Sequence, residues 1–405
     1  MLDDFGQRIR DIILSEMDLS RELSDEEICD LIGSVVSREA RDRPMTIKDR
    51  AELERTIFNS LRKLDVLQEL VDDRDVTEIM VNGPNDIFYE KAGRIQRFKG
   101  HFSSEEKLED VIQQIVGRHN RVVNQASPIV DTRLSDGSRV NIVLNPISIG
   151  GSAVSIRKFP EHPMSMERLV EIEALSPEVA RLLQILTQAK YNIFISGGTG
   201  SGKTTFLNAL SQYIPDDERI ITIEDSAELQ LLGAKNIVRL ETRNANTDGV
   251  NPITIRDLIR TALRMRPDRI IVGECRGAEA LDMLQAMNTG HDGSLSTGHA
   301  NSPHDIISRI ETMVLQGQDF PLNAIRQQIA SGIDIIVQLG RLRDKSRRVL
   351  EISEVDGFMD GEIVLHTLYR FEETAVLDSG RIQGFLKKAG TLCHTDKLMA
   401  AGLSV

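Results

Sequence analysis

A glycine-rich stretch, SGGTGSGKTT, runs from Ser196 to Thr205 and is a poor candidate for a helix or a strand, because glycine is entropically costly to order and supplies no side chain to pack. It fits the pattern GxxxxGK[ST], follows the apolar run NIFI and precedes a segment with helical spacing. This order predicts a loop whose backbone N–H groups surround phosphate oxygens. A flexible glycine turn is the alternative. The predicted nucleotide-binding residues are Gly197, Gly198, Thr199, Gly200, Ser201, Gly202, Lys203, Thr204 and Thr205.

Acidic residues that follow apolar runs are candidates for the chemistry on a bound phosphate. Glu274 follows RIIVG, where a carboxylate is presented at the end of a buried strand, and is the candidate general base. Glu224 and Asp225 end the run ITIED, and Glu228 lies further along. The hydroxyl of Thr204, and Glu224 directly or through water, are the candidate Mg²⁺ ligands. For each acid, a solvated position at a strand end is the alternative.

Two histidines, His291 and His299, lie in the glycine-rich segment TGHDGSLSTGHAN. An imidazole beside a phosphate site can contact the γ-phosphate and respond to its loss, because its charge changes near neutral pH. A histidine at a strand end is more often a local hydrogen-bonding residue. The residues alone therefore leave both histidines as candidates.

Composition limits the class of protein. The chain has 405 residues, 40% hydrophobic and 27% charged, as expected for a globular protein of two or three domains. Its formal net charge of −13 and lack of Trp argue against a protein that coats nucleic acid, so we expect no nucleic-acid partner. The three cysteines lack the spacing of a zinc site or a disulfide framework. Neither a long apolar run nor a signal-peptide pattern is present, which predicts a cytoplasmic protein.

Patterning predicts the secondary structure in outline. Helical spacing dominates the first part of the chain, with helix starts at Ser24 and Thr46. TEIMVNGPNDIFYEK then predicts a hairpin, and DTRLSDGSRVNIVL predicts two short strands. The later runs NIFIS, RIITIED, NIVRLE, RIIVGE, GSLSTGH and DIIVQL alternate with helical segments, which is typical of an α/β domain with a largely parallel sheet. VLEISEVDGFMDGEIVLHTLYRF predicts another hairpin, with turns at Asp356-Gly357 and Asp360-Gly361.

These patterns predict five parts of the chain. They are a helical N-terminal arm at 1–69, a small α+β domain at 70–157, a linker with several prolines at 158–177, a P-loop domain at 178–374, and a weakly patterned, mobile C-terminal tail at 375–405.

Four segments, GGTGSGKT, TIEDSAE, RIIVGECRG and STGHAN, occur in one order. Their combination resembles the secretion ATPase superfamily, whose members power type II and type IV secretion and type IV pili. TEIMVNGP, DGSRVN, SIRKF, LRMRPDRIIVGE and HANSP are most similar to the tight-adherence pilus branch, the CpaF-like ATPases. The resemblance covers residues from about 60 to about 370.

The resemblance implies a hexameric ring of subunits with a RecA-like P-loop domain and a smaller PAS-like α+β domain, between which ATP is held. It also implies a motor that hydrolyses ATP with Mg²⁺ and acts on a polytopic platform protein at the inner face of the cytoplasmic membrane, without a transmembrane segment. By position, Lys203 and Thr204 bind phosphates and Mg²⁺, Glu224 belongs to the Asp box, Glu274 is the Walker B acid, and His299 is the His-box residue. Cys275 stands where an apolar residue is expected, which indicates packing rather than redox chemistry.

Arginines complete the predicted site, because a positioned guanidinium stabilises the charge of a phosphoryl-transfer transition state. The family pattern suggests that arginines of the smaller domain reach the phosphates on domain closure or from a neighbouring subunit. The candidates are Arg133, Arg139 and Arg157, with Arg264 and Arg266 as additional ones. A surface salt bridge is the alternative role for any one of them.

Three other functions remain open from the sequence. A type IV secretion or conjugation ATPase would have the same motifs and would differ in its gene neighbours. A RecA-like DNA motor would share the P-loop sheet but would need a basic groove with aromatic residues. A nucleotide-gated scaffold would not need the acid at Glu274. Neither the direction of filament movement nor the cargo follows from the sequence.

Overall fold

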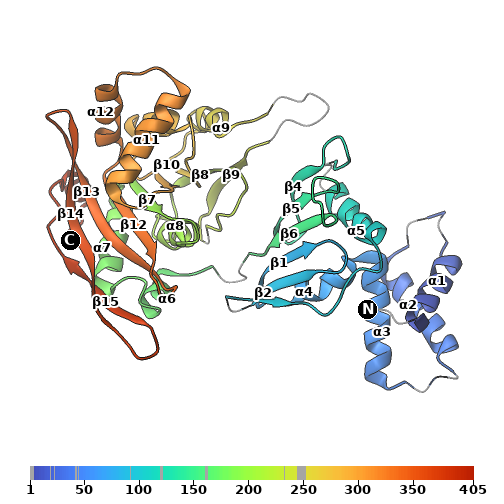
Figure 1. The fold of residues 1–405 in the computed structure, drawn as a ribbon. Helices are drawn as coiled ribbons and strands as arrows, with labels where there is room; N and C mark the ends of the chain where they lie inside the picture. The colour runs from blue at the N-terminus through green and yellow to red at the C-terminus, as the bar shows by residue number, and fades with distance from the viewer. Residues whose placement is uncertain are drawn as a thin grey trace. The chain divides into compact units, whose positions relative to one another are not determined.

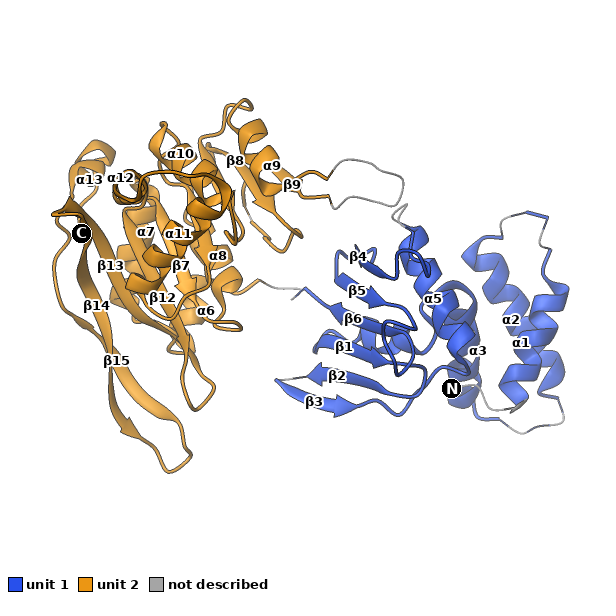
Figure 2. Ribbon diagram, turned by 45° about the horizontal axis from the view of Figure 1, so that its top comes forward, with its two compact units in different colours: residues 1–161 blue, residues 162–405 orange. Residues whose placement is uncertain are grey.

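The computed structural model describes residues 4–18, 20–21, 23–41, 43, 45–91, 93–118, 122–159, 163–231, 233–243 and 252–405 (Figure 1). The chain divides into two compact units, Met1–Glu161 and His162–Val405 (Figure 2). Each unit contains hydrophobic cores of its own. Three residues of the predicted linker, 160–162, lie outside the described residues.

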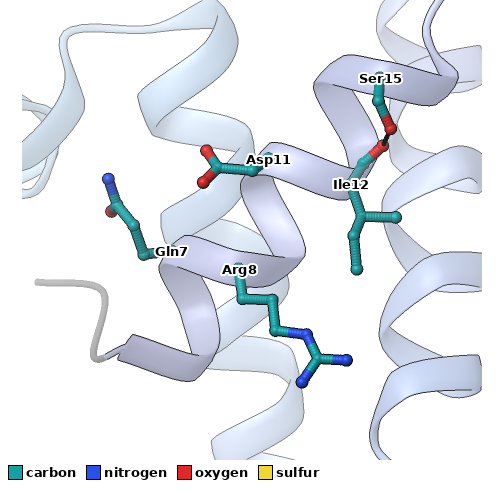
Figure 3. A pocket seen from close by; sticks show the side chains of 5 residues that line it. All are labelled: Gln7, Arg8, Asp11, Ile12 and Ser15. Atoms are coloured by element: carbon teal, nitrogen blue, oxygen red, sulfur yellow. Dashed lines mark hydrogen bonds between the residues drawn. The ribbon is translucent and has the colours of Figure 1, made fainter.

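The first unit begins with three helices, α1 (Asp4–Glu16), α2 (Asp25–Glu39) and α3 (Ile47–Arg62). Both helix starts predicted from the sequence are confirmed as capping boxes, in which Ser24 and Thr46 accept the N–H groups of Glu27 and Asp49. The apolar faces of the helices form a separate small core of isoleucines and valines. A shallow hollow beside α1 is lined by mostly polar side chains (Figure 3). The helices are therefore held together by their own apolar contacts.

The rest of the first unit is an antiparallel sheet with a helix. A short 3-10 turn η1 (Asp65–Leu67) and α4 (Gln68–Asp72) lead into it, and α5 (Glu105–Gly117) packs on it. Its described strands are β1 (Val76–Asn82), β2 (Ile87–Lys91), β3 (Arg94–Arg97), β4 (Ile129–Arg133), β5 (Arg139–Val143) and β6 (Ala153–Arg157). They are ordered β3-β2-β1-β6-β5-β4. Both predicted hairpins, β1–β2 and β4–β5, are confirmed.

The second unit is built on one large sheet. Its described strands are β7 (Ile193–Gly197), β8 (Arg219–Glu224), β9 (Asn236–Glu241), β10 (Arg269–Val272), β11 (Leu295–Gly298), β12 (Ile335–Arg341), β13 (Arg347–Met359), β14 (Glu362–Val376) and β15 (Ile382–Lys388). They are ordered β15-β14-β13-β12-β7-β11-β10-β8-β9. The pairs from β12 to β9 are parallel, and those from β12 to β15 are antiparallel. All six predicted strand runs of this domain are confirmed as strands.

Helices cover both faces of this sheet, so that its central strands are buried. One face packs against α7 (Pro177–Gln188) and α8 (Lys203–Ser211). The other face packs against α9 (Ile255–Ala262), α10 (Ala280–Asn288), α11 (Pro303–Gly317) and α12 (Leu322–Gly332). Apolar side chains therefore point to both faces along the central strands, as expected for a covered parallel sheet.

The structure contains elements that the sequence pattern does not predict. A short helix, α6 (Met166–Glu171), lies within the predicted linker, and Pro177 begins α7. The predicted tail contains β15, which pairs with β14, and α13 (Asp396–Ala401), two elements that its weak sequence pattern did not indicate. Its mobility stays a prediction. Asp360-Gly361 connects β13 and β14 as predicted, whereas Asp356-Gly357 lies within β13 at an irregularity of its pairing. The hairpin strands are therefore longer than expected.

Among the described residues, no helix is both long enough and apolar enough to span a lipid bilayer.

Candidate functional site

The four motif segments meet at one edge of the large sheet. Gly197 ends β7, Glu224 ends β8, and Gly298 ends β11, while β10 ends at Val272 shortly before Glu274. These strands are parallel, so their carboxyl ends lie on the same side. Ligands of open α/β sheets bind outside this edge.

The phosphate loop joins β7 to α8 with a backbone that presents donors rather than side chains. Gly200 and Gly202 have φ angles of 71° and 95°, which favour glycine, and Gly202 is the N-cap of α8. It has no side chain to accept from the first turn, in contrast to Ser176, which caps α7. The first N–H groups of a helix have no acceptor within it, and its N-terminus carries partial positive charge. The loop therefore offers an anion site.

Gly197 is fixed by close packing. A Cβ atom at this position would lie 2.5 Å from Oγ of Ser201 and 2.7 Å from the carbonyl oxygen of Leu339 on β12. Ser201 is buried, and within the described residues its hydroxyl has no hydrogen-bond partner. The absent side chain thus lets the loop fold tightly over the end of the sheet.

Lys203 carries the charge of the loop in a buried position. Its side chain is 8% exposed, and Nζ donates to the carbonyl oxygens of Gly197 at 3.0 Å and Gly198 at 3.1 Å. Nζ also lies 3.3 Å from Nδ1 of His299. Burial lowers the pKa of Lys203, while the nearby Glu274 carboxylate acts in the opposite direction. The ammonium is thus poorly hydrated and is held by neutral acceptors.

His299 connects this lysine to the acid at position 274. An ammonium can only donate, so Nδ1 is the acceptor nitrogen and Nε2 carries the hydrogen of the neutral ring. Nε2 lies 2.7 Å from Oε1 of Glu274, although the two are not aligned as a regular hydrogen bond. Burial lowers the pKa of His299, Glu274 raises it, and the Lys203 charge lowers it further. The net lowering favours the neutral ring.

Arg276 holds the other oxygen of Glu274. A guanidinium nitrogen of Arg276 lies 2.6 Å from Oε2, so the carboxylate lies between an imidazole and a guanidinium. The pKa of Arg276 is raised, mainly by its hydrogen bond to Glu274. Sequence reasoning did not single out Arg276. The available signal was its position two residues after the acid in GECRG, since such side chains share a face in extended backbone.

Glu224 holds the loop after β8 through hydrogen bonds to its backbone. Its side chain is buried, and Oε1 accepts the backbone N–H groups of Glu228 at 2.8 Å and Leu229 at 3.0 Å. Its Cγ also packs where a side chain of Gly273 would lie, directly before Glu274. The carboxylate therefore contacts the segments that carry the other acids. Asp225 and Glu228 lie close enough to Arg276 to raise its pKa.

Three of the sequence candidates lie at the opposite edge of the sheet. His291 precedes β11, and its Nδ1 lies 3.3 Å from the carbonyl oxygen of Ala286. Arg264 and Arg266 precede β10. Because the motif residues follow the strands whereas these three precede them, the strand lengths separate them from the phosphate loop. A role for these three residues in contacting the phosphates stays a prediction.

The other candidate arginines form one row in the first unit. Arg133, Arg139 and Arg157 are directly opposite one another across β4, β5 and β6. Glu78 on β1 continues the row and lies 3.7 Å from Arg157. The phosphate loop belongs to the second unit. Sequence reasoning therefore grouped three arginines that the fold indeed places side by side.

The donor set fits a nucleotide phosphate with Mg²⁺. Bare N–H groups and a buried ammonium suit phosphate oxygens, and the Thr204 hydroxyl in the first turn of α8 suits a hard cation. In the described part of the chain, no three His, Cys, Asp or Glu side chains are grouped as metal ligands. Mg²⁺ typically uses one or two protein ligands and takes the rest from phosphates and water. The site is thus suited to magnesium that arrives with a nucleotide.

Residues 60–383 match the family described as type II/IV secretion system protein. The chain belongs to this family. A Mycobacterium tuberculosis protein, whose name assigns it provisionally to conjugal transfer, is 33% identical over 322 residues, which cover 77% of this chain and 91% of that protein. The type IV secretion system protein PtlH of Bordetella pertussis is 33% identical over 320 residues, which cover 73% of this chain and 94% of PtlH.

A solved structure supports the same fold. The pilus retraction motor PilT with bound ADP superposes with a TM-score of 0.55 at 22% identity, over 82% of this chain and 84% of PilT. The predicted membership of the secretion ATPase superfamily is therefore confirmed, and so is the predicted α/β fold class. The narrower assignment to the tight-adherence branch stays a prediction.

The packing around Gly197 leads to a first prediction. We expect Gly197→Ala to destabilise the second unit by about 1–3 kcal/mol, because the added methyl group overlaps a backbone carbonyl. Gly198→Ala is the matched control, since nothing lies within 4 Å of its Cβ position. It should stay within about 1 kcal/mol of the wild type. Denaturant unfolding of the three proteins measures the difference, and equal stability of both variants would contradict the packing argument.

The environments of two histidines predict opposite titrations. The pKa of His299 is lowered by burial, whereas that of His394 is raised, mainly by its hydrogen bond to the backbone of Asp356. In protein labelled with ¹³C at histidine Cε1, we expect the NMR signal of His299 to titrate below pH 6.5 and that of His394 above it. Substitution of each histidine by Asn assigns the signals.

The same shifts fix the sign of each residue's effect on stability. The imidazole of His299 binds a proton more readily in the unfolded chain than in the folded protein. Its contribution to the free energy of unfolding is therefore complete above pH 6.5 and is lost as the pH falls through the folded pKa. His394 contributes below pH 6.5 and loses that contribution as the pH rises through its raised pKa. Titration of both signals on the same side of pH 6.5 would show that these environments are wrong.

Proposed function

We propose that this chain is a motor ATPase that hydrolyses ATP with Mg²⁺ and drives assembly of a tight-adherence type IV pilus, with retraction left open. The observation that carries the proposal is the continuous set of contacts from the phosphate-loop ammonium of Lys203 through His299 to Glu274. It connects the group that would bind phosphate to the group that would act on water. The choice of the pilus branch is supported by the resemblance of TEIMVNGP, DGSRVN, SIRKF, LRMRPDRIIVGE and HANSP to the tight-adherence ATPases.

In this proposal the loop N–H groups and Lys203 would hold the phosphates, and the Thr204 hydroxyl in the first turn of α8 would contact the metal ion. Bound Mg²⁺ supplies positive charge that offsets the charge of the phosphates. Glu224 keeps the loop after β8 in place beside Glu274, and it would contact the metal ion directly or through water. His299 orients Glu274 from one side and Arg276 from the other. The active side chains thus lie beyond the carboxyl ends of buried strands or in the first turn of α8.

Glu274 is the proposed general base. A carboxylate can accept a proton from water while it orients the oxygen for attack on the γ-phosphate. Its two oxygens now contact His299 and Arg276, so one of them must become available to water when the nucleotide is in place. The side chain of Arg276 is 61% exposed, which supports a movement of this guanidinium into solvent that would release Oε2.

The assembled form is proposed to be a hexamer that works at the inner face of the cytoplasmic membrane on a polytopic platform protein. Arg133, Arg139 and Arg157 would stabilise the transition state from the first unit, within one subunit or across a subunit boundary. An arginine in this role typically accelerates hydrolysis about 10³- to 10⁵-fold. The row of three side chains on one sheet supports the proposal, and residues 158–177 would be the linker between the domains.

A second candidate is a type IV secretion or conjugation ATPase. It is favoured by the names of relatives at 33% identity, which refer to conjugal transfer and to type IV secretion. The two candidates share the hydrolytic site and differ in the membrane partner. Gene neighbours that encode pilins would favour the first, and those that encode a conjugation channel would favour the second. The net charge of −13 disfavours a DNA motor, whose ATPase activity DNA would stimulate.

Two substitutions separate binding from hydrolysis. Lys203→Ala should weaken ATP binding by about ten- to a hundredfold, because a charged hydrogen bond to phosphate is lost. Glu274→Gln should keep ATP binding and lower turnover by about 10²- to 10⁴-fold, because the amide cannot accept the proton. Calorimetric binding and phosphate release measure the two effects.

Glu171→Gln is the control for the loss of a carboxylate, since Glu171 is an exposed partner of Arg168 on α6. It should change neither binding nor turnover. Full turnover in Glu274→Gln would show that another group is the base, whereas ATP binding without turnover in the wild type would favour a nucleotide-gated scaffold.

A mixing experiment tests whether arginines act between subunits. Arg157→Gln and Glu274→Gln should each have strongly reduced activity when assembled alone. If Arg157 reaches a neighbouring site, a mixture forms sites with one intact glutamate and one intact arginine, and activity returns in part. Specific activity of the wild type should also rise with protein concentration until assembly is complete. Activity that is flat across monomeric and assembled fractions would contradict the ring.

A further inference from the structure

The turn between β12 and β13 lies beside the phosphate loop, on the side away from Glu274. Strand β12 pairs with β7 so that Leu339 is opposite Gly197, and it continues to Arg341. In the order of the sheet, β12 and β13 lie on one side of β7, whereas β11 and β10 lie on the other. The end of β12 therefore borders the loop from the flank that carries none of the motif residues.

Arg347 extends along the loop itself. Its Cδ atom lies 3.6 Å from the position that a Cβ of Gly202 would occupy, next to the first turn of α8. The residue is exposed, as is Arg341. The long side chain of Arg347 thus brings a guanidinium to the part of the loop where the helix N-terminus presents its N–H groups.

Arg341 and Arg347 are directly opposite each other on the antiparallel pair β12–β13. Side chains in this relation share a face with Cβ atoms about 5 Å apart, and like charges there destabilise the pair. Other arginines of the same hairpin have acidic partners: Arg343 pairs with Glu373, and Arg348 with Glu173. Across the described residues, no ion pair or side-chain hydrogen bond involves the guanidinium groups of Arg341 or Arg347, which take part in the sheet through their backbones. Two opposed guanidinium groups beside an anion-binding loop are suited to bind an anion between them.

We propose that Arg341 and Arg347 bind the phosphates of the nucleotide held by the loop, from the flank opposite Glu274. This inference rests on the proposed function, because it needs a nucleotide at Lys203. Guanidinium groups bind phosphate oxygens through two parallel hydrogen bonds, which suits a pair that flanks one anion. The nucleotide is then contacted by Lys203 and the β10–β11 residues on one side and by this arginine pair on the other.

The proposal predicts how the arginine pair affects stability and phosphate binding. Without nucleotide the two like charges oppose each other, and with nucleotide the phosphates neutralise both. Removal of one arginine should therefore weaken phosphate binding without destabilising the ligand-free protein. A purely structural arginine would show the reverse, with a loss of stability and no specific effect on phosphate.

The test uses the full chain without Mg²⁺, with ADP and inorganic pyrophosphate as separate probes in calorimetry. We expect Arg347→Gln and Arg341→Gln each to weaken binding of both probes about tenfold, as for loss of one charged hydrogen bond. The melting temperature of the ligand-free variants should be unchanged or slightly raised. Arg343→Gln is the matched control in the same turn, since its partner is Glu373 rather than the loop. It should bind both probes as the wild type does.

Each other outcome overturns the inference. Wild-type affinities in both variants would exclude contact with the nucleotide. Weaker ADP binding with unchanged pyrophosphate binding would place the arginines on the base or ribose rather than on the phosphates. If the ligand-free variants melted at a lower temperature and bound the probes more weakly because they were partly unfolded, the arginines would have a structural role. If the wild type itself bound no ADP, the proposed function would fail together with this inference. If the wild type binds ADP and only the variants behave unexpectedly, the inference alone fails.

Discussion

The site depends on a positive charge that is taken out of water without a direct anionic partner. The ammonium of Lys203 is held by two carbonyl oxygens of its own loop and faces a neutral imidazole nitrogen. Burial of a charge is unfavourable unless hydrogen bonds replace its hydration, and carbonyl dipoles do this only in part. The pKa of Lys203 is lowered because the hydration lost on burial is only partly replaced. A phosphate would supply the missing negative charge, so the loop is arranged for an anion that it must bind from outside.

The sheet provides the rigid frame that makes this arrangement possible. Parallel strands bring the carboxyl ends of β7, β10 and β11 to one edge, and their side chains are fixed by cores on both faces. Lys203 and His299 are 96 residues apart in sequence, yet their nitrogen atoms lie 3.3 Å apart. Short loops after buried strands hold such groups more precisely than long loops could. The chemistry therefore follows from strand order as much as from the motifs.

The sequence allowed the motifs, the central strands and the helix starts to be predicted, because each has a local cause. The capping boxes at Ser24 and Thr46 need only three residues of spacing, and the covered strands need only an apolar run. His291 and His299 differ in a way that sequence could have shown, since only His299 follows its strand. Strand β15 was missed because it is an edge strand with half of its side chains in water, and α13 because it is too short for a periodic signal.

Contacts between distant segments were beyond local reasoning. The pairing of Leu339 with Gly197 places Arg341 beside the phosphate loop, and no pattern within either segment indicates it. The contact of Nζ of Lys203 with Nδ1 of His299 is of the same kind, and it has a physical consequence. An anion that drew the ammonium away from the loop carbonyls would also remove the donor from Nδ1. The imidazole, which now contacts Glu274 at 2.7 Å without good alignment, would then be free to turn and align Nε2 with the carboxylate. Phosphate binding and the orientation of the carboxylate would thus be coupled through one ring.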